Sequence, residues 1–138
     1  MTKSLRVKAS VDSFDLVKDF MEQIVDEQGC DEQIKCQIMI AIEEVFINIA
    51  SYAYEDKDGT IDVNVTVETT GNKPIYITFC DGGIPFDPLK VPDPDIHEDG
   101  MKRKIGGLGI FLVKQSMDHL DYSRTDGKNV LKIQHHLL

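Results

Sequence analysis

Apolar and polar residues alternate in some stretches of the chain and recur every three to four positions in others. The alternating stretch LRVKASV (Leu5 to Val11) predicts a half-buried strand. Apolar residues at helical spacing follow the N-cap pair Asp12-Ser13 and predict a helix that ends at Gly29. A second, longer helix is predicted to begin after a cap at Asp31 and to end near Tyr54.

Two pairs of short alternating segments predict hairpins. TIDVNVTVE (residues 60–68) and IYITFC (75–80) flank the turn signal GNKP. Near the C-terminus, LDYSR and VLKIQHH flank the turn TDGKN, which predicts a second hairpin. A third helix is predicted between the hairpins, from about Gly107 to Met117.

The segment 87–106 has no sustained periodicity and contains three prolines and the run KRK. A loop of this length is uncommon inside a compact domain and is usually functional or disordered. We therefore expect this segment to be either functional or disordered.

Strands and helices follow one another in blocks rather than in strict βαβ alternation, which favours an α+β fold. We predict a two-layer sandwich, in which a mixed, mostly antiparallel sheet is covered on one face by helices. The polar alternates Asp62, Asn64, Thr66 and Glu68 fit a sheet whose other face is solvated. At 138 residues, the chain is predicted to be one domain spanning 1–138.

Composition narrows the classes of function. The net charge of −9 argues against direct binding of nucleic acid, which requires clustered basic residues. No segment has the ~20 apolar residues of a membrane span, and the N-terminus lacks the apolar core of a signal peptide. The three cysteines form no C-x-x-C motif, so we expect a reduced, cytoplasmic protein.

The first motif with candidate chemistry lies on the long helix, in AIEEVFINIASYAY. Glu44 and Asn48 are four residues apart and therefore project from the same side of the helix. They offer a proton acceptor and a neutral oxygen ligand for a hard cation such as Mg²⁺, which often binds through one or two protein oxygens plus phosphate. The same spacing is also typical of an ordinary polar stripe.

The second motif, CDGGIPFDP, follows a predicted strand. Asp81 can accept a hydrogen bond from an exocyclic amine such as that of adenine, and Gly83 lets a flat ligand approach the main chain. An Asp-Gly turn after a strand has a purely structural interpretation as well.

The third motif is IGGLGIFLV, in which Gly106, Gly107 and Gly109 precede or open an apolar helix. Backbone N–H groups at a helix start bind phosphate, although glycines also occur there for close packing.

Together and in this order, the three motifs resemble the ATP-binding fold shared by histidine kinases, gyrase, Hsp90 and MutL, the GHKL family. Pro85-Phe86 and GGLGIFLVKQSMDHLDY are most similar to the branch of bacterial anti-sigma factors and serine-protein kinases that includes RsbW and SpoIIAB. The resemblance covers about residues 5 to 136.

The resemblance implies roles for seven residues. Glu44 matches the general base and Asn48 the Mg²⁺ ligand, while Asp81 and Gly83 match the adenine pocket. Gly107, Leu108 and Gly109 match the loop against the phosphates of ATP, and residues 87–106 match a lid from which Lys102, Arg103 or Lys104 could reach a phosphate.

The resulting hypothesis is an ATP-dependent serine/threonine protein kinase that phosphorylates a STAS-type anti-anti-sigma protein and sequesters a sigma factor. The resemblance also implies a homodimer. The alternatives are a nucleotide-gated binding module with weak catalysis, the detached ATPase domain of a signalling histidine kinase, and an α+β protein that binds no nucleotide. The second alternative is disfavoured, because we do not expect this sequence to contain a dimerisation helix with a phosphorylatable histidine ahead of the ATPase domain.

Overall fold

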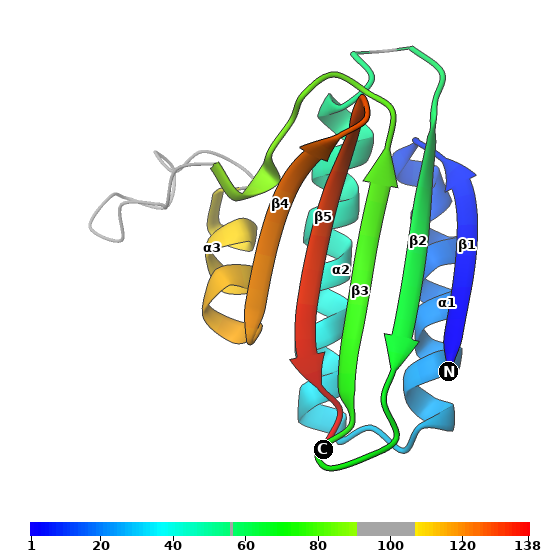
Figure 1. The fold of residues 1–138 in the computed structure, drawn as a ribbon, viewed down its shortest axis with the longest axis vertical. Coiled ribbons are helices and arrows are strands. Elements are labelled where there is room, and N and C mark those ends of the chain that lie inside the picture. The colour runs from blue at the N-terminus through cyan, green and yellow to red at the C-terminus, as the bar shows by residue number, and fades with distance from the viewer. Residues whose placement is uncertain (56, 91–106) are drawn as a thin grey trace.

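The computed structural model describes residues 1–55, 57–90 and 107–138, with only the backbone described at residues 107 and 108. Five strands form one sheet in the order β1-β2-β3-β5-β4 (Figure 1). The strands are β1 (Thr2–Lys8), β2 (Thr60–Val67), β3 (Pro74–Asp81), β4 (His119–Thr125) and β5 (Lys128–His136). The helices are α1 (Phe14–Glu27), α2 (Glu32–Tyr52) and α3 (Gly107–Ser116), with short 3-10 turns η1 (Val11–Ser13) and η2 (Pro88–Lys90).

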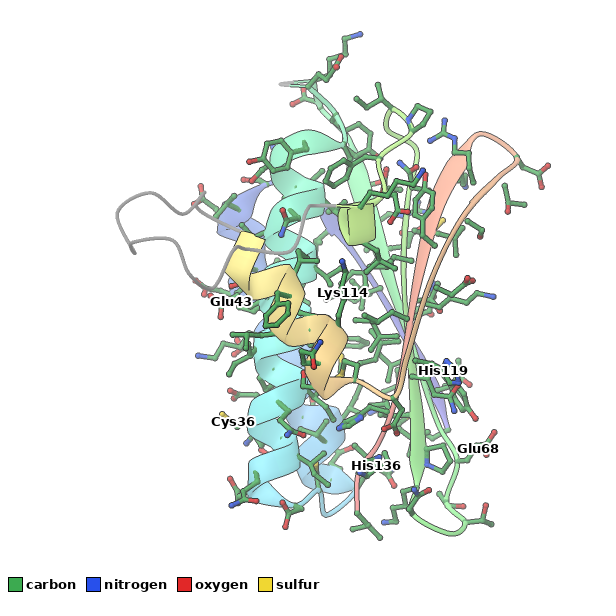
Figure 2. All side chains as sticks on the ribbon, turned by 90° about the vertical axis from the view of Figure 1, so that its left-hand side faces the viewer. Cys36, Glu43, Glu68, Lys114, His119 and His136 are labelled. Carbon is green, nitrogen blue, oxygen red and sulfur yellow. The ribbon has the colours of Figure 1, made fainter. Side chains whose placement is uncertain are left out.

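The predicted α+β class is confirmed. The three helices lie on one side of the sheet, as the edge-on view in Figure 2 shows. All four strand pairings are antiparallel, so the sheet has no parallel pair within the described residues.

Alternation along the strands sorts side chains between the two faces of the sheet. On β2, the four residues Ile61, Val63, Val65 and Val67 are buried, whereas the polar residues between them are half-buried on the opposite face. This is the pattern of a sheet with one covered and one solvated face.

The core lies between the covered face of the sheet and helix α2. Phe46 from α2 and Phe79 from β3 are both fully buried. Burial of one such side chain contributes about 1.5–3 kcal/mol of stability, so these apolar contacts hold α2 against the sheet.

The element boundaries differ from the prediction mainly at the N-terminus. The first strand covers residues 2–8 rather than 5–11, because the Ser10 side chain accepts a hydrogen bond from Asp12 N and starts η1. Ser13 makes no capping hydrogen bond through its side chain, contrary to expectation. Asp31 does cap α2, because its Oδ1 accepts hydrogen bonds from Gln33 N at 3.0 Å and Ile34 N at 3.3 Å. Helix α2 ends at Tyr52, close to the predicted end.

Both predicted hairpins are confirmed, but the order of strands adds something that the sequence did not indicate. Strand β5 lies between β3 and β4, and pairs with β3 so that Asn129 stands opposite Asp81. The connection from β3 to β4 therefore crosses over β5 and carries η2 and α3.

Within the residues described, no helix combines the length and apolar character that a membrane span requires. The three cysteines are free thiols.

Candidate functional site

Asp81 is the last residue of β3 and is one of the few buried charged side chains, with 4% of its surface exposed. Its Oδ1 accepts hydrogen bonds from Gly83 N and from Asn129 Nδ2, both at 2.9 Å. Both donors reach the same oxygen, so they fix the orientation of the carboxylate. An ionised carboxylate is well suited to accept such a hydrogen bond in a buried position.

The loop after Asp81 is anchored to the C-terminal end of α2. Ile84 N donates to the carbonyl of Ala53 at 2.7 Å. A side chain at Gly83 would overlap that same carbonyl group. The structure thus gives Gly83 a packing role; the predicted role beside a nucleotide base remains a prediction.

Two further side chains hold the same loop. Arg124 donates from Nη1 to the carbonyl of Gly83 at 2.8 Å. The Tyr54 hydroxyl accepts from Gly82 N at 2.8 Å and donates to the carbonyl of Thr60 at 2.6 Å.

Asn129 organises the site and was missed in the sequence, where it stands at the end of the turn TDGKN. It is 3% exposed. Besides Asp81, its Nδ2 donates to the carbonyl of Ile84 at 2.7 Å, and its Oδ1 accepts from Phe86 N at 3.1 Å and from the hydroxyl of Tyr122 at 2.5 Å. Only the register of β5 against β3 reveals this role.

Glu44 and Asn48 lie one turn apart on α2, and Glu44 contacts the first turn of α3. Asn48 is 8% exposed, and its Nδ2 donates to the carbonyl of Glu44 at 2.6 Å, which orients the amide with Oδ1 as its acceptor end. Burial, and secondarily the negative charge of Glu43, raise the pKa of Glu44 above its ordinary value. Glu43 itself is exposed and lies on the outer side of α2 (Figure 2), as expected for the adjacent helical position.

Gly109, in the first turn of α3, lies directly against Glu44. A side chain at Gly109 would overlap the carboxylate and Cγ of Glu44. The glycine therefore allows the N-terminal end of α3, where backbone N–H groups favour anions, to meet a candidate base.

The three motifs converge along α2. Gly83 contacts Ala53 at one end, Gly109 contacts Glu44 further back, and Asn48 lies between them in the sequence of the helix. Glu44 and Ala53 are nine residues apart, which corresponds to ~13 Å along a helix. The contacts with Gly83 and with Gly109 are therefore separated by about two and a half turns of α2.

Other predicted site residues fall partly or wholly outside this description. Gly107 begins α3, and Leu108 follows it in the same turn. Gly106 and the basic run Lys102, Arg103 and Lys104 lie outside the described residues, as does most of the predicted lid.

The geometry and the comparisons with known proteins agree on a class. A family model described as a histidine kinase-like ATPase domain matches residues 7–135. The chain therefore belongs to this family of ATPase domains, the GHKL family of the sequence prediction, and a domain of this kind implies nucleotide binding.

Curated relatives narrow the resemblance to one branch. The chain is 26% identical to serine-protein kinase RsbW of Staphylococcus aureus strains bovine RF122 / ET3-1 and MRSA252, over 130 residues that cover 91% of this chain and 81% of each relative. RsbW of strain MSSA476 is 25% identical over the same length. The predicted likeness to RsbW is confirmed.

Proposed function

We propose that the protein is an ATP-dependent serine/threonine protein kinase of the anti-sigma type. The observation that carries this proposal is the contact of the Glu44 carboxylate with Gly109. It brings a proton acceptor to the helix start where phosphate groups would bind. The named function of the RsbW relatives supports the same reaction class.

Glu44 is the proposed general base. It accepts the proton of a partner hydroxyl as that oxygen bonds to the γ-phosphorus of ATP and the bond to the ADP oxygen breaks. A raised pKa brings a carboxylate nearer to the pH at which it works, which makes it a better base while it remains ionised. Gly107, Leu108 and Gly109 would present backbone N–H groups to the phosphates.

The residues present also fit Mg²⁺. The Asn48 amide is buried and held by a hydrogen bond, with its oxygen as the available ligand atom, and one protein oxygen together with phosphates suffices for this ion. When bound, the ion supplies neutralisation of charge on the phosphates.

Asp81 is the residue proposed to recognise adenine. Its buried carboxylate would accept a hydrogen bond from the exocyclic amine of adenine, whereas guanine presents a carbonyl at the equivalent place. A hydrogen bond to a charged group contributes about 1.5–3 kcal/mol. Asp81→Asn is therefore expected to weaken ATP binding ~10-fold to 100-fold in calorimetry with Mg²⁺, and a variant that binds ATP as tightly as the parent would contradict this role.

The proposed phosphate acceptor is a STAS-domain anti-anti-sigma protein, and the proposed sequestered partner is a sigma factor. To test the reaction, the chain is mixed with a STAS-domain protein of the same organism, Mg²⁺ and γ-labelled ATP. Label should appear on a serine or threonine of the STAS protein. Tight ATP binding without any transfer of label would defeat the kinase proposal.

Two matched variants separate catalysis from binding. Glu44→Gln should lower the rate of transfer by ~10²–10⁴-fold, whereas Glu43→Gln, on the exposed side of the same helix, should retain it. ATP-dependent capture of the partners by Glu44→Gln, with no transfer by the parent chain, would favour a nucleotide-gated binding module.

Light scattering would test the predicted homodimer in the same preparations.

A further inference from the structure

Asp118, His135 and His136 form a cluster at the end of the sheet opposite to Asp81. Asp118 lies between α3 and β4, and the two histidines end β5. His135 lies six residues beyond Asn129 on β5, which corresponds to ~20 Å along a strand. The cluster is therefore separate from the candidate nucleotide site.

One ligand atom from each of these three residues lies within 4.8 Å of the others. Nδ1 of His136 is 2.7 Å from Oδ2 of Asp118, and Nδ1 of His135 is 3.5 Å from Oδ1. The two imidazole rings are adjacent, with centroids 4.3 Å apart. Two imidazoles and one carboxylate thus converge on one small volume.

The buried ring of His135 has one nitrogen without a hydrogen-bond partner. The residue is 3% exposed, and its Nδ1 is the one buried side-chain nitrogen or oxygen in the described part of the chain that has no hydrogen-bond partner. A buried polar atom without a partner costs about 1–3 kcal/mol. This nitrogen lies 3.5 Å from Oδ1 of Asp118, a separation at which the structure shows no hydrogen bond between them.

The other ring nitrogen explains why Nδ1 is available. Nε2 of His135 lies 3.4 Å from Oε1 of Gln37 on α2. The amide oxygen can only accept, so a hydrogen bond between these two atoms requires the proton on Nε2 and leaves a lone pair on Nδ1. That lone pair and the Asp118 carboxylate are both acceptors, and a cation between them would satisfy both.

We propose that Asp118, His135 and His136 bind a divalent transition-metal ion of the zinc class. Imidazole nitrogen together with carboxylate oxygen is a ligand set that suits Zn²⁺, Ni²⁺ and Cu²⁺, whereas Mg²⁺ and Ca²⁺ prefer oxygen alone. Zinc takes four ligands at about 2.0–2.2 Å, and water would supply the fourth position.

Metal–ligand distances of this size place tetrahedral ligands roughly 3.3 Å apart. The separations of 2.7 and 3.5 Å end on different oxygens of Asp118, so the carboxylate and the imidazole rings would have to shift for one oxygen and two nitrogens to share an ion. Binding would break the hydrogen bond between His136 and Asp118, and the proton on Nδ1 of His136 would move to Nε2 so that Nδ1 presents its lone pair. Gln37 would keep the ring of His135 in the ligating tautomer, as hydrogen-bond acceptors beside metal-binding histidines do.

The ion would join two parts of the chain that are distant in sequence. Asp118 follows the C-terminal end of α3 by two residues, and the N-terminal turn of α3 contacts Glu44. A bound metal would therefore fix the far end of α3 to the end of β5 and stabilise the folded chain.

Calorimetric titration of the untagged full chain with Zn²⁺, after removal of metals by a chelator and without nucleotide, tests the site. One equivalent of zinc should bind and raise the melting temperature. Asp118→Asn, at a side chain 45% exposed and thus tolerant of substitution, should weaken binding at least ~100-fold. Gln37→Leu should weaken it ~10-fold. His119→Gln provides the matched control, since His119 is an exposed histidine outside the cluster.

Cobalt identifies the ligands independently. The visible spectrum of the Co²⁺-loaded protein should show nitrogen and oxygen ligation without a thiolate charge-transfer band. His136→Gln should abolish that spectrum. The proposal is overturned if the parent chain binds no zinc, if Asp118→Asn binds it as tightly as the parent, or if thiolate ligation shows that the cysteines hold the metal.

Discussion

Asn129 on β5 donates a hydrogen bond from Nδ2 to Oδ1 of Asp81 on β3, with the two atoms 2.9 Å apart. The two residues are directly paired in the register of the sheet, and both are buried. The carboxylate proposed to read adenine is thus positioned by a neutral donor that the sheet itself places. Asn129 also binds the loop that follows Asp81, so it couples the strand end to that loop.

Asn129→Ala should destabilise the protein by about 2–3 kcal/mol, because several buried groups lose their partner at once. Those groups include Phe86 N, the carbonyl of Ile84 and the hydroxyl of Tyr122. Urea unfolding measures the change. Asn64→Ala, on the solvated face of β2 where the amide oxygen accepts from the Ser4 hydroxyl, is the control and should cost less than half as much. Equal losses of stability in the two variants would contradict the role of Asn129 as the partner of several buried groups.

Gly83→Ala and Gly82→Ala form a matched pair one residue apart. A methyl group at Gly83 would overlap the carbonyl of Ala53, and this obstacle is backbone that cannot rotate away. Overpacking of this kind costs typically about 1–3 kcal/mol. At Gly82 the nearest atom, the hydroxyl of Tyr54, is 3.8 Å from the added carbon, so the change should be nearly neutral. Thermal unfolding of the two variants distinguishes them, and a neutral Gly83→Ala would remove the packing argument.

Gly109→Ala should act through Glu44. Alanine is the better helix former by about 1 kcal/mol, but its methyl group would overlap the Glu44 carboxylate, which must then rotate away. We expect a loss of phosphoryl transfer with little change in the free energy of unfolding. In a Glu44→Ala background the side chain that would overlap the methyl group is absent, so Gly109→Ala should stabilise the protein there. Additive effects on stability in this double-mutant cycle would contradict the contact.

The sequence was sufficient for the elements and for the fold class, because alternation and helical spacing are local signals. Asp31, for example, carries its capping role in its own side chain, and the structure confirms it. The start of the chain was predicted less well, since Ser10 rather than Ser13 makes the capping hydrogen bond.

Candidate site residues could be predicted from the sequence only where the type of residue and its spacing indicate a chemical role. Glu44, Asn48 and Asp81 are ordinary candidates by type and spacing. The role of Asn129 depends on β5 inserting between β3 and β4, and pairing between distant strands leaves no local signal. Tertiary packing also supplies a reason for Gly83 that the motif did not suggest, namely its contact with Ala53.

The raised pKa of Glu44 predicts how stability and activity depend on pH. Below the ordinary value of 4.5 the carboxyl is protonated in both folded and unfolded chains, so Glu44→Gln should have no effect through this group. As the pH rises above 4.5, the unfolded chain ionises first, and the folded chain loses stability until the pH exceeds the raised pKa. Glu44→Gln should therefore stabilise the protein at neutral pH, with a gain that disappears as the pH falls toward 4.5.

Urea unfolding of the parent and of Glu44→Gln between pH 4 and 8 measures that gain, and Glu68→Gln, at an exposed position (Figure 2), should show none. The same ionisation controls the proposed base, because only the carboxylate can accept a proton. Transfer of label by the parent chain should therefore rise with pH across the range in which the stabilising effect of Glu44→Gln appears. If the two profiles rise in different ranges of pH, the group that limits transfer is not Glu44.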